Sequence, residues 1–369
     1  MFIRTTLLFC VLLIAATIQS TELQAQQPVT IAGQDVSLRL GSTIQPRFTY
    51  VNEDTNTQDI DRIGFGVRRF RLRTYIGVGS HVQVFSQLEG SGTNAQLLDL
   101  RVDYKLNSDL TLRVGRFAGA QPRAMAMTLH SDIDAIDRAA SADYWARNTL
   151  GADARDYGAE IVWKPNRLEY RLFLHNGDNR YNYRSGAVDE SPGLNNSSKK
   201  MAVSSMIRFF PNNDTHTDIG IYGSYNGGGG QNPFAAKNYY SAAFHAYRGT
   251  FPGHYPFRVK FDAILTSFND VPIQGGLENR LFAGATIFTG YLVRTDTEVF
   301  GRLERFSTNA HSDQNQNTDF ATIGLTYSFS AAQGKNFQSN KVTAAYTWKN
   351  NHITEIIASI FQIQVQVFL

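Results

Sequence analysis

The chain has 369 residues, of which 42% are hydrophobic and only 18% charged, and its formal net charge is +3. The mean hydropathy is −0.28, and past the N-terminus no apolar stretch is long enough for a membrane-spanning helix. A helical membrane protein is therefore excluded, and no proline- or serine-rich linker divides the chain into separate domains.

Residues 1–25 are typical of a secretory signal peptide, with Arg4 as the basic start and Leu7 to Ile18 as a short apolar core. An uncleaved anchor helix is the alternative, but this core is short for a membrane span. The only cysteine, Cys10, lies inside the core. The remaining chain, 26–369, would therefore have no disulfide and no cysteine-ligated metal. Export without disulfides suits the envelope of a Gram-negative cell.

From residue 36 onward the chain repeats segments in which apolar and polar side chains alternate. The first has Val36, Leu38 and Leu40 on one face and Ser37 and Arg39 on the other. Because side chains along a strand point to opposite faces, each segment has one apolar and one polar face. The expected strands are 36–51, 62–78, 81–90, 96–106, 110–117, 156–164, 167–176, 200–210, 217–226, 238–249, 257–268, 280–291, 297–306, 318–330, 342–349 and 356–369.

The connections between these strands alternate in length. Short turns such as Gly79-Ser80 alternate with longer polar loops, although 331–341 is long for a turn. The expected long loops are Asn52 to Asp61, Ala118 to Arg155, Gly177 to Lys199, Gly227 to Lys237, Asn269 to Asn279 and Ser307 to Asn317. The pattern predicts an all-β fold, a roughly 16-stranded antiparallel transmembrane β-barrel with a long pore-constricting loop after the fifth strand. Such a barrel has a water-filled lumen, and both termini would be periplasmic.

Arginines dominate the face that we expect to line the pore. In the second strand Phe70 and Leu72 would face lipid, which places Arg69, Arg71 and Arg73 in the lumen, because arginines on the lipid face would be costly. The expected pore-lining, anion-binding residues are Arg39, Arg47, Arg69, Arg71, Arg73, Arg101, Arg113, Arg171, Arg258 and Lys260. Carboxylates such as those of Asp99 and Asp103 share this face. The alternative is therefore a mixed polar lining that merely solvates water.

The loop from Ala118 to Arg155 combines charged and apolar residues, and its middle, Met125 to Trp145, shows no β alternation and fits a short helix. Its apolar content argues against disorder. We expect it to fold into the barrel and narrow the pore, and an extracellular flap is the alternative. The charged residues of this constriction loop are Asp132, Asp134, Asp137, Arg138 and Arg147.

Signals for enzymatic or metal chemistry are weak. The glycine run Gly227 to Gly230 lacks the lysine and the following helix of a phosphate loop, and the eight histidines show no metal-ligand spacing. His175 or His245 with a serine would form a catalytic triad only by chance. We therefore predict no catalytic residue, no metal, no cofactor and no nucleic-acid partner.

Three segments resemble the phosphate-selective porin O and P family. They are Phe65 to Arg73, Leu97 to Leu106 and Leu112 to Phe117, and the resemblance covers roughly 36–165. It implies a trimeric barrel whose lumen arginines guide phosphate or polyphosphate. By resemblance Arg68 and Arg69 match the family's double arginine, whereas strand parity places only Arg69 in the lumen. The chain departs from the family's lysine clusters at the pore entrances, since it has only nine lysines.

The sequence thus favours an outer-membrane porin that gives passive diffusion to small hydrophilic solutes and prefers anions such as phosphate. Its expected partners are outer-membrane lipid, lipopolysaccharide and two further copies of itself. The alternatives are a non-conducting structural or adhesion barrel and, less favoured, an outer-membrane enzyme.

Overall fold

The computed structural model describes residues 29–31, 34–55, 59–92, 94–150, 153–177, 201–211, 216–227, 234–249 and 255–369. The expected signal peptide, 1–25, lies outside the described residues. Within the part of the chain that is described, no helix is both long and apolar enough to cross a membrane.

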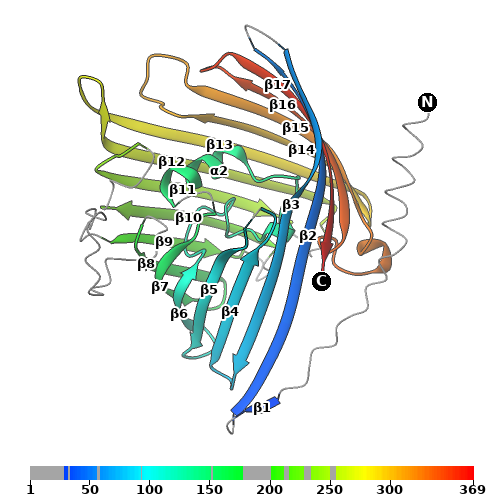
Figure 1. Cartoon of the computed structure of the whole chain (residues 1–369). Helices are drawn as coiled ribbons and strands as arrows, with labels where there is room; N and C mark the ends of the chain where they lie inside the picture. Colours follow the sequence, from blue (N-terminus) through cyan, green and yellow to red (C-terminus); the bar gives the residue numbers. More distant parts are fainter. Residues whose placement is uncertain are drawn as a thin grey trace.

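Antiparallel strands make up most of the described chain, each paired with the next (Figure 1). The strands are β1 (Val29–Ile31), β2 (Gln34–Asp54), β3 (Asp59–Val78), β4 (Val82–Glu89), β5 (Gln96–Lys105), β6 (Leu110–Phe117), β7 (Asp156–Trp163), β8 (Leu168–His175), β9 (Ala202–Phe209), β10 (Thr217–Asn226), β11 (Asn238–Arg248), β12 (Phe257–Ile273), β13 (Gly276–Arg294), β14 (Thr297–Ser307), β15 (Asn317–Ser328), β16 (Lys341–Asn351) and β17 (Ile356–Phe368). The pairing of β17 with β2, with Phe361 opposite Tyr50, closes the sheet. Among the described residues β2 to β17 therefore form a closed 16-stranded barrel, as the sequence predicted.

Two expected loops are instead largely strand. The segment 269–279 holds the end of β12, a turn at Gln274 and Gly275, and the start of β13. Apolar residues there continue beyond a bulge that follows Phe268, and Gly275 supplies the positive φ, 97°, that the tight turn requires. The segment 52–61 likewise extends β2 and β3. The prediction of long loops at these two places was wrong, because polar residues, which favour loops, lie here within strands that continue. A short 3-10 helix, η2 (Ala331–Gln333), lies in the 331–341 connection.

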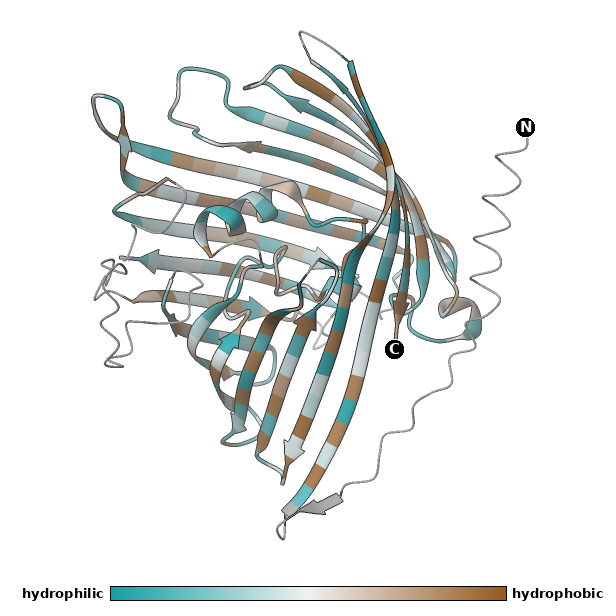
Figure 2. Ribbon diagram, viewed as in Figure 1, coloured by the Kyte–Doolittle hydropathy of each residue, from teal (hydrophilic) through white to brown (hydrophobic). Residues whose placement is uncertain are grey.

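Apolar side chains lie on the outside of the barrel, and Figure 2 shows their alternation with polar ones along the strands. Leucine, isoleucine, valine and aromatic side chains from strands all around the barrel are exposed, among them Leu303, Ile323 and Leu325. So large an exposed apolar surface is unfavourable in water and fits lipid contact. Because the sheet is closed, the backbone N–H and C=O groups of paired strands are satisfied within the hydrocarbon region without help from lipid.

The connection between β6 and β7 folds back inside the barrel (Figure 1). It contains a 3-10 helix, η1 (His130–Asp132), and an α-helix, α2 (Ala140–Thr149). Nε2 of His130 lies 3.0 Å from Oγ1 of Thr43 on β2, and the indole of Trp145 donates to Oγ of Ser241 on β11 at 3.1 Å. The predicted position of the loop in the barrel is confirmed, and the alternative of an external flap is wrong.

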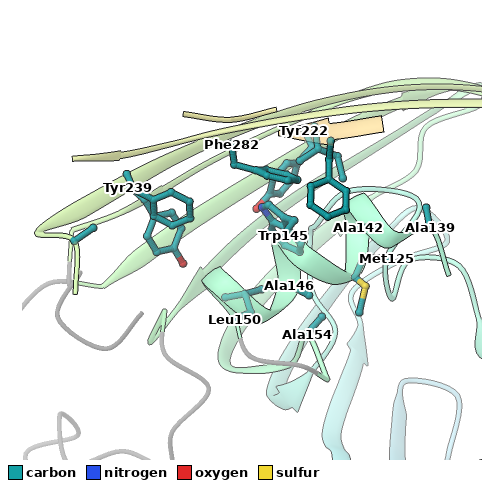
Figure 3. Packing of buried hydrophobic residues seen from close by; sticks show 14 of the residues in the cluster. Met125, Ala139, Ala142, Trp145, Ala146, Leu150, Ala154, Tyr222, Tyr239 and Phe282 are labelled. Atoms are coloured by element: carbon teal, nitrogen blue, oxygen red, sulfur yellow. The ribbon is translucent and has the colours of Figure 1, made fainter. Parts of the chain in front are cut away.

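Helix α2 packs against the inner wall through one apolar face. Ala142, Trp145 and Ala146 contact aromatic residues that point inward from the barrel strands, including Tyr222 and Phe282 (Figure 3). Among the described residues of the loop no side chain caps the N-terminus of α2. Instead the carboxylate of Glu304, on β14, accepts a hydrogen bond from the amide of Ala140. The loop is therefore held by a hydrophobic core inside the barrel.

Replacing Trp145 by alanine should weaken the docking of the loop by about 3–5 kcal/mol, because it empties the centre of this core and leaves Ser241 without its indole partner. Limited trypsin digestion of the folded protein should then cut the loop faster. Trp163→Ala, which removes an exposed indole from the outer face of β7, is the matched control and should leave the loop protected. Equal cleavage rates in the two variants would contradict the expectation.

Candidate pore constriction

Three arginines of β3 point into the barrel. The exposed fractions of Arg69, Arg71 and Arg73 are 4%, 9% and 5%, whereas Leu72 between them is 47% exposed. Arg71 donates to Oε2 of Glu89 at 2.7 Å. Within the described part of the chain Arg69 and Arg73 form no salt bridge: Arg69 donates to Oε1 of Gln45, and Arg73 donates to Oγ1 of Thr43 and lies over the ring of Phe368. Two of the three charges therefore lack a carboxylate partner.

Arg68 also reaches the lumen, because β3 contains a β-bulge at this residue. Arg69 is opposite Gln45 and Val67 is opposite Pro46, so Arg68 is an extra residue in the ladder. Pro46 has no amide hydrogen to contribute and fits such a break. The bulge turns Arg68 toward the loop, where its Nε donates to Oδ1 of Asp137 at 3.1 Å. The prediction that strand alternation keeps Arg68 out of the lumen was wrong, because simple alternation takes no account of a bulge.

Two loop carboxylates bind the loop to opposite parts of the wall. Asp137 accepts hydrogen bonds from Arg47 on β2, at 2.7 Å, and from Arg68. Asp134 accepts from Nη1 of Arg258, at 2.6 Å, and from Lys260, both on β12. Burial alone would raise the pKa of each carboxyl, but these cations outweigh burial and hold both pKa values well below the usual range of aspartate. Both carboxylates are therefore ionised at neutral pH.

The loop should stay docked as the pH falls from neutral to ~4. A carboxyl whose pKa is lowered by folding contributes stability above its unfolded pKa of ~4 and loses it as the pH falls through the lowered folded value. Asp134 and Asp137 both behave in this way, whereas burial raises the pKa of the neighbouring Asp132. Single-channel conductance is expected to be constant from pH 7 to 5. A conductance increase within that range would contradict this expectation, because it would show that the bonds of Asp134 and Asp137 to the wall break above pH 5.

The predicted arginines of β5 to β8 pair with carboxylates of their own or a neighbouring strand. Arg113 bonds to Glu160 at 3.1 Å, and Arg171 bonds to Glu169 at 2.7 Å. Arg101 lies 3.0 Å from Asp103. Elsewhere, Arg39 stacks on a tyrosine ring, and Arg147 forms a salt bridge with Asp143 on the exposed face of α2. This part of the wall is mixed in charge, so the excess of cations lies on β3.

A cavity of about 450 Å³ lies between the β3 arginines and the loop. Its lining contains six arginines and four carboxylates: Arg68, Arg69, Arg71, Arg138, Arg147, Arg155, Glu89, Asp137, Asp143 and Asp153. The opening is on this side because the apolar face of α2 fills the opposite side of the lumen. The structure thus gathers basic residues from distant parts of the sequence around one aqueous space.

Arg138 is the loop cation that has no carboxylate contact in the described residues. It donates to the carbonyl oxygens of Met125 and Thr128, the latter at 2.8 Å. Burial, followed by repulsion from Arg71 and Arg155, lowers the pKa of Arg138 to about 9. It still carries its charge at neutral pH and adds to the positive field of the cavity.

A serine, a histidine and an aspartate are aligned on the inner wall. Nδ1 of His175 lies 2.7 Å from Oδ2 of Asp156, and its Nε2 lies 2.9 Å from Oγ of Ser204. This is the order of a catalytic triad. In the described chain, however, Ser204 is buried and β9 is paired on both edges, so no free strand amide lies beside it for an oxyanion hole. The three side chains link β7, β8 and β9 through hydrogen bonds.

In the described part of the chain no group of three or more histidine, cysteine, aspartate or glutamate side chains is arranged to hold a metal ion.

Solved structures of outer-membrane channels are similar to this barrel. The anion-selective porin from Comamonas acidovorans aligns at 13% identity and a TM-score of 0.63, over 90% of this chain and 100% of its own. The channel DcaP of Acinetobacter baumannii aligns at 10% and 0.61, over 93% and 100%. The trimer form of OmpT, an outer membrane protein of Vibrio cholerae, aligns at 10% and 0.54, over 90% and 99%. The fold is that of a porin.

No protein-family model matches the sequence, and no curated relative matches it significantly. These comparisons therefore do not support the resemblance to the phosphate-selective porins in particular. The porin fold agrees with the internal loop and with the aqueous cavity beside it.

Proposed function

We propose that this protein is an outer-membrane porin through which small hydrophilic solutes diffuse passively, with a preference for anions. The observation that carries the proposal is the constriction cavity, whose lining has more arginines than carboxylates. Fixed positive charge raises the local concentration of anions, and the effect weakens as salt screens it. Because four carboxylates share the cavity, the preference should be moderate.

Phosphate is one anion that fits this lining. Guanidinium groups offer planar pairs of donors that match phosphate and carboxylate oxygens, and Arg69 forms no direct salt bridge in the described chain; its guanidinium donates to Gln45. The resemblance of the β3 segment to phosphate-selective porins supports the same choice. We propose phosphate as a member of the permeating class.

The proposed setting is the outer membrane of a Gram-negative cell, reached by cleavage of the signal peptide 1–25, with lipopolysaccharide around the outer rim. The mature chain would be 26–369. We propose that the protein works as a homotrimer, and the similarity of its fold to the trimer form of OmpT supports this state. The apolar outer face gives both lipid and neighbouring copies a surface to contact.

Planar-bilayer recording of the purified protein tests the proposal. A porin gives discrete conductance steps, and a KCl gradient should give a reversal potential of the sign for anion preference. A structural or adhesion barrel would give no steps, and turnover of a lipid substrate would instead indicate an enzyme. Absence of steps at high protein concentration would overturn the proposed function.

A further inference from the structure

The loop inside the barrel borders a second cavity, on the side of β14 to β17. This cavity, the side pocket, has a volume of about 140 Å³ and lies between loop residues 135–140 and the inner faces of these four neighbouring strands (Figure 1). It shares Asp137 and Arg138 with the arginine-lined constriction cavity. The loop therefore stands between two spaces of different lining.

One part of the side pocket is apolar although it faces the lumen. Phe320 on β15 and Ile360 on β17 line it two residues away from the polar Thr322 and Gln362. Phe361, the next residue along β17, is 37% exposed on the outer face. Phe320 and Ile360 are only partly buried, so they border the pocket instead of being enclosed in a core. Such side chains favour contact with an apolar group over contact with water.

The other part of the side pocket carries guanidinium and hydroxyl groups. Arg138 donates to carbonyl oxygens of the loop and has no carboxylate contact in the described residues. Arg302, on β14, donates to the backbone carbonyl of Asp137 at 2.6 Å. The hydroxyl oxygens of Thr322 and Thr347 lie 2.9 Å apart on the same wall. These groups provide hydrogen-bond donors beside the apolar part.

The two carboxylates in the lining are already engaged. Asp137 accepts hydrogen bonds from arginines of β2 and β3 that do not line this pocket. Glu304 accepts from the amide of Ala140, and one of its oxygens lies 2.7 Å from Nε of Arg302. The charge of Arg138 is therefore left for another anion.

The side pocket is closed toward the end of the barrel at which β17 ends. There Ile136 packs in an apolar cluster with phenylalanines of β13 and β14. Nζ of Lys341 donates to the carbonyl oxygen of Ile133 at 2.9 Å, and Nε2 of Gln366 donates to that of Ser131 at 3.1 Å. Within the described part of the chain these contacts join the loop to the wall below the pocket. The pocket therefore suits binding of a solute better than its passage.

We propose that the side pocket binds a small monocarboxylate that has an apolar body. The carboxylate would contact Arg138 and Arg302, because guanidinium groups offer paired donors to its two oxygens. The body would lie against Phe320 and Ile360. Inorganic phosphate has no apolar part and gains nothing from these two side chains. Because Arg138 borders both cavities, the bound anion would neutralise part of the positive field of the constriction.

Calorimetric titration of the folded protein in detergent tests the site with benzoate, formate and benzamide. Benzoate should bind at least about tenfold more tightly than formate, which lacks the apolar body, and than benzamide, which lacks the charge. Ile360→Gln should remove most of the advantage over formate. The sheet should tolerate this change, since glutamine already occupies the next three lumen positions of β17. Gln96→Ala, in the lining of the constriction cavity, is the control and should leave benzoate affinity unchanged.

An absence of benzoate binding, or equal affinities for benzoate and formate, would overturn the proposal. Equal affinities for benzoate and benzamide would refute the role of the arginines. Unchanged benzoate affinity in Ile360→Gln would place the ligand outside the side pocket. If that variant does not fold, Ile360→Trp, whose larger side chain fills the pocket, should abolish benzoate binding, and retained binding would count against the site.

Channel recordings separate this site from the proposed function. If the wild type gives no conductance steps, the porin proposal fails, whereas calorimetry still decides whether benzoate binds. If steps occur, benzoate should move the reversal potential in a KCl gradient toward the cation side more than an equal concentration of formate does, because it neutralises Arg138. Equal effects of the two anions would contradict the placement of the carboxylate beside Arg138.

Discussion

Replacing residues 130–149 by a short glycine–serine linker should raise single-channel conductance by a factor of about two or more, because this segment occupies the lumen. It carries η1, the carboxylates of Asp134 and Asp137, and α2, all of which contact the inner wall. The barrel should still form, since the strand pairing of the wall does not depend on the loop. Conductance steps in a planar bilayer measure the effect.

The control is a deletion of the same kind in the connection between β14 and β15, residues 310–315, which joins paired strands and is mostly exposed. It should leave the conductance near the wild-type value. Circular dichroism and the heat-dependent gel mobility of folded barrels should confirm that both variants contain the sheet. Unchanged conductance after removal of 130–149 would mean that the ions do not pass beside this loop.

Alternation of apolar and polar residues predicted the barrel, because every strand has one face toward lipid and one face toward the lumen. The pattern even ends close to the observed bounds, as for β6 and β10. The same reasoning failed at Arg68, since a bulge shifts alternation without a strong local signal beyond Pro46. It also failed at the turn of 269–279, where polar residues sit within continuing strands.

The interior could be predicted only in part. Alternation assigns inward positions to the lumen, yet Tyr222, Phe282 and Phe306 point inward and pack on α2 rather than contact water. Their packing partners lie on α2, which is distant from them in the sequence, and local sequence patterns do not encode such contacts. The partners of the arginines depend in the same way on strand register. Alternation therefore placed Arg69, Arg71 and Arg73 on one face of the strand, and the structure was needed to show which of them are paired.

Substitution of Arg69, Arg71 and Arg73 by glutamine should reduce anion preference, because it removes three positive charges from one wall of the constriction. Glutamine keeps a polar side chain of similar reach, so the lumen stays wet and the fold is spared. The reversal potential across a KCl gradient should move toward the cation side by on the order of 10 mV. Arg305→Gln removes an exposed guanidinium from the outer face and is the control, with no shift expected.

The outcome depends on whether nearby carboxylates already cancel the three arginines. Asp99 and Asp103 are the obvious candidates, but Asp99 pairs with Arg155, and Asp103 pairs with Arg101 and Arg113. Of the three substituted arginines only Arg71 forms a salt bridge, with Glu89, in the described chain. Arg69 and Arg73 should therefore contribute most of the field, and raising the salt concentration should shrink the difference between variant and wild type. A cation-selective wild type, or a triple variant with an unchanged reversal potential, would remove the β3 arginines as the source of selectivity.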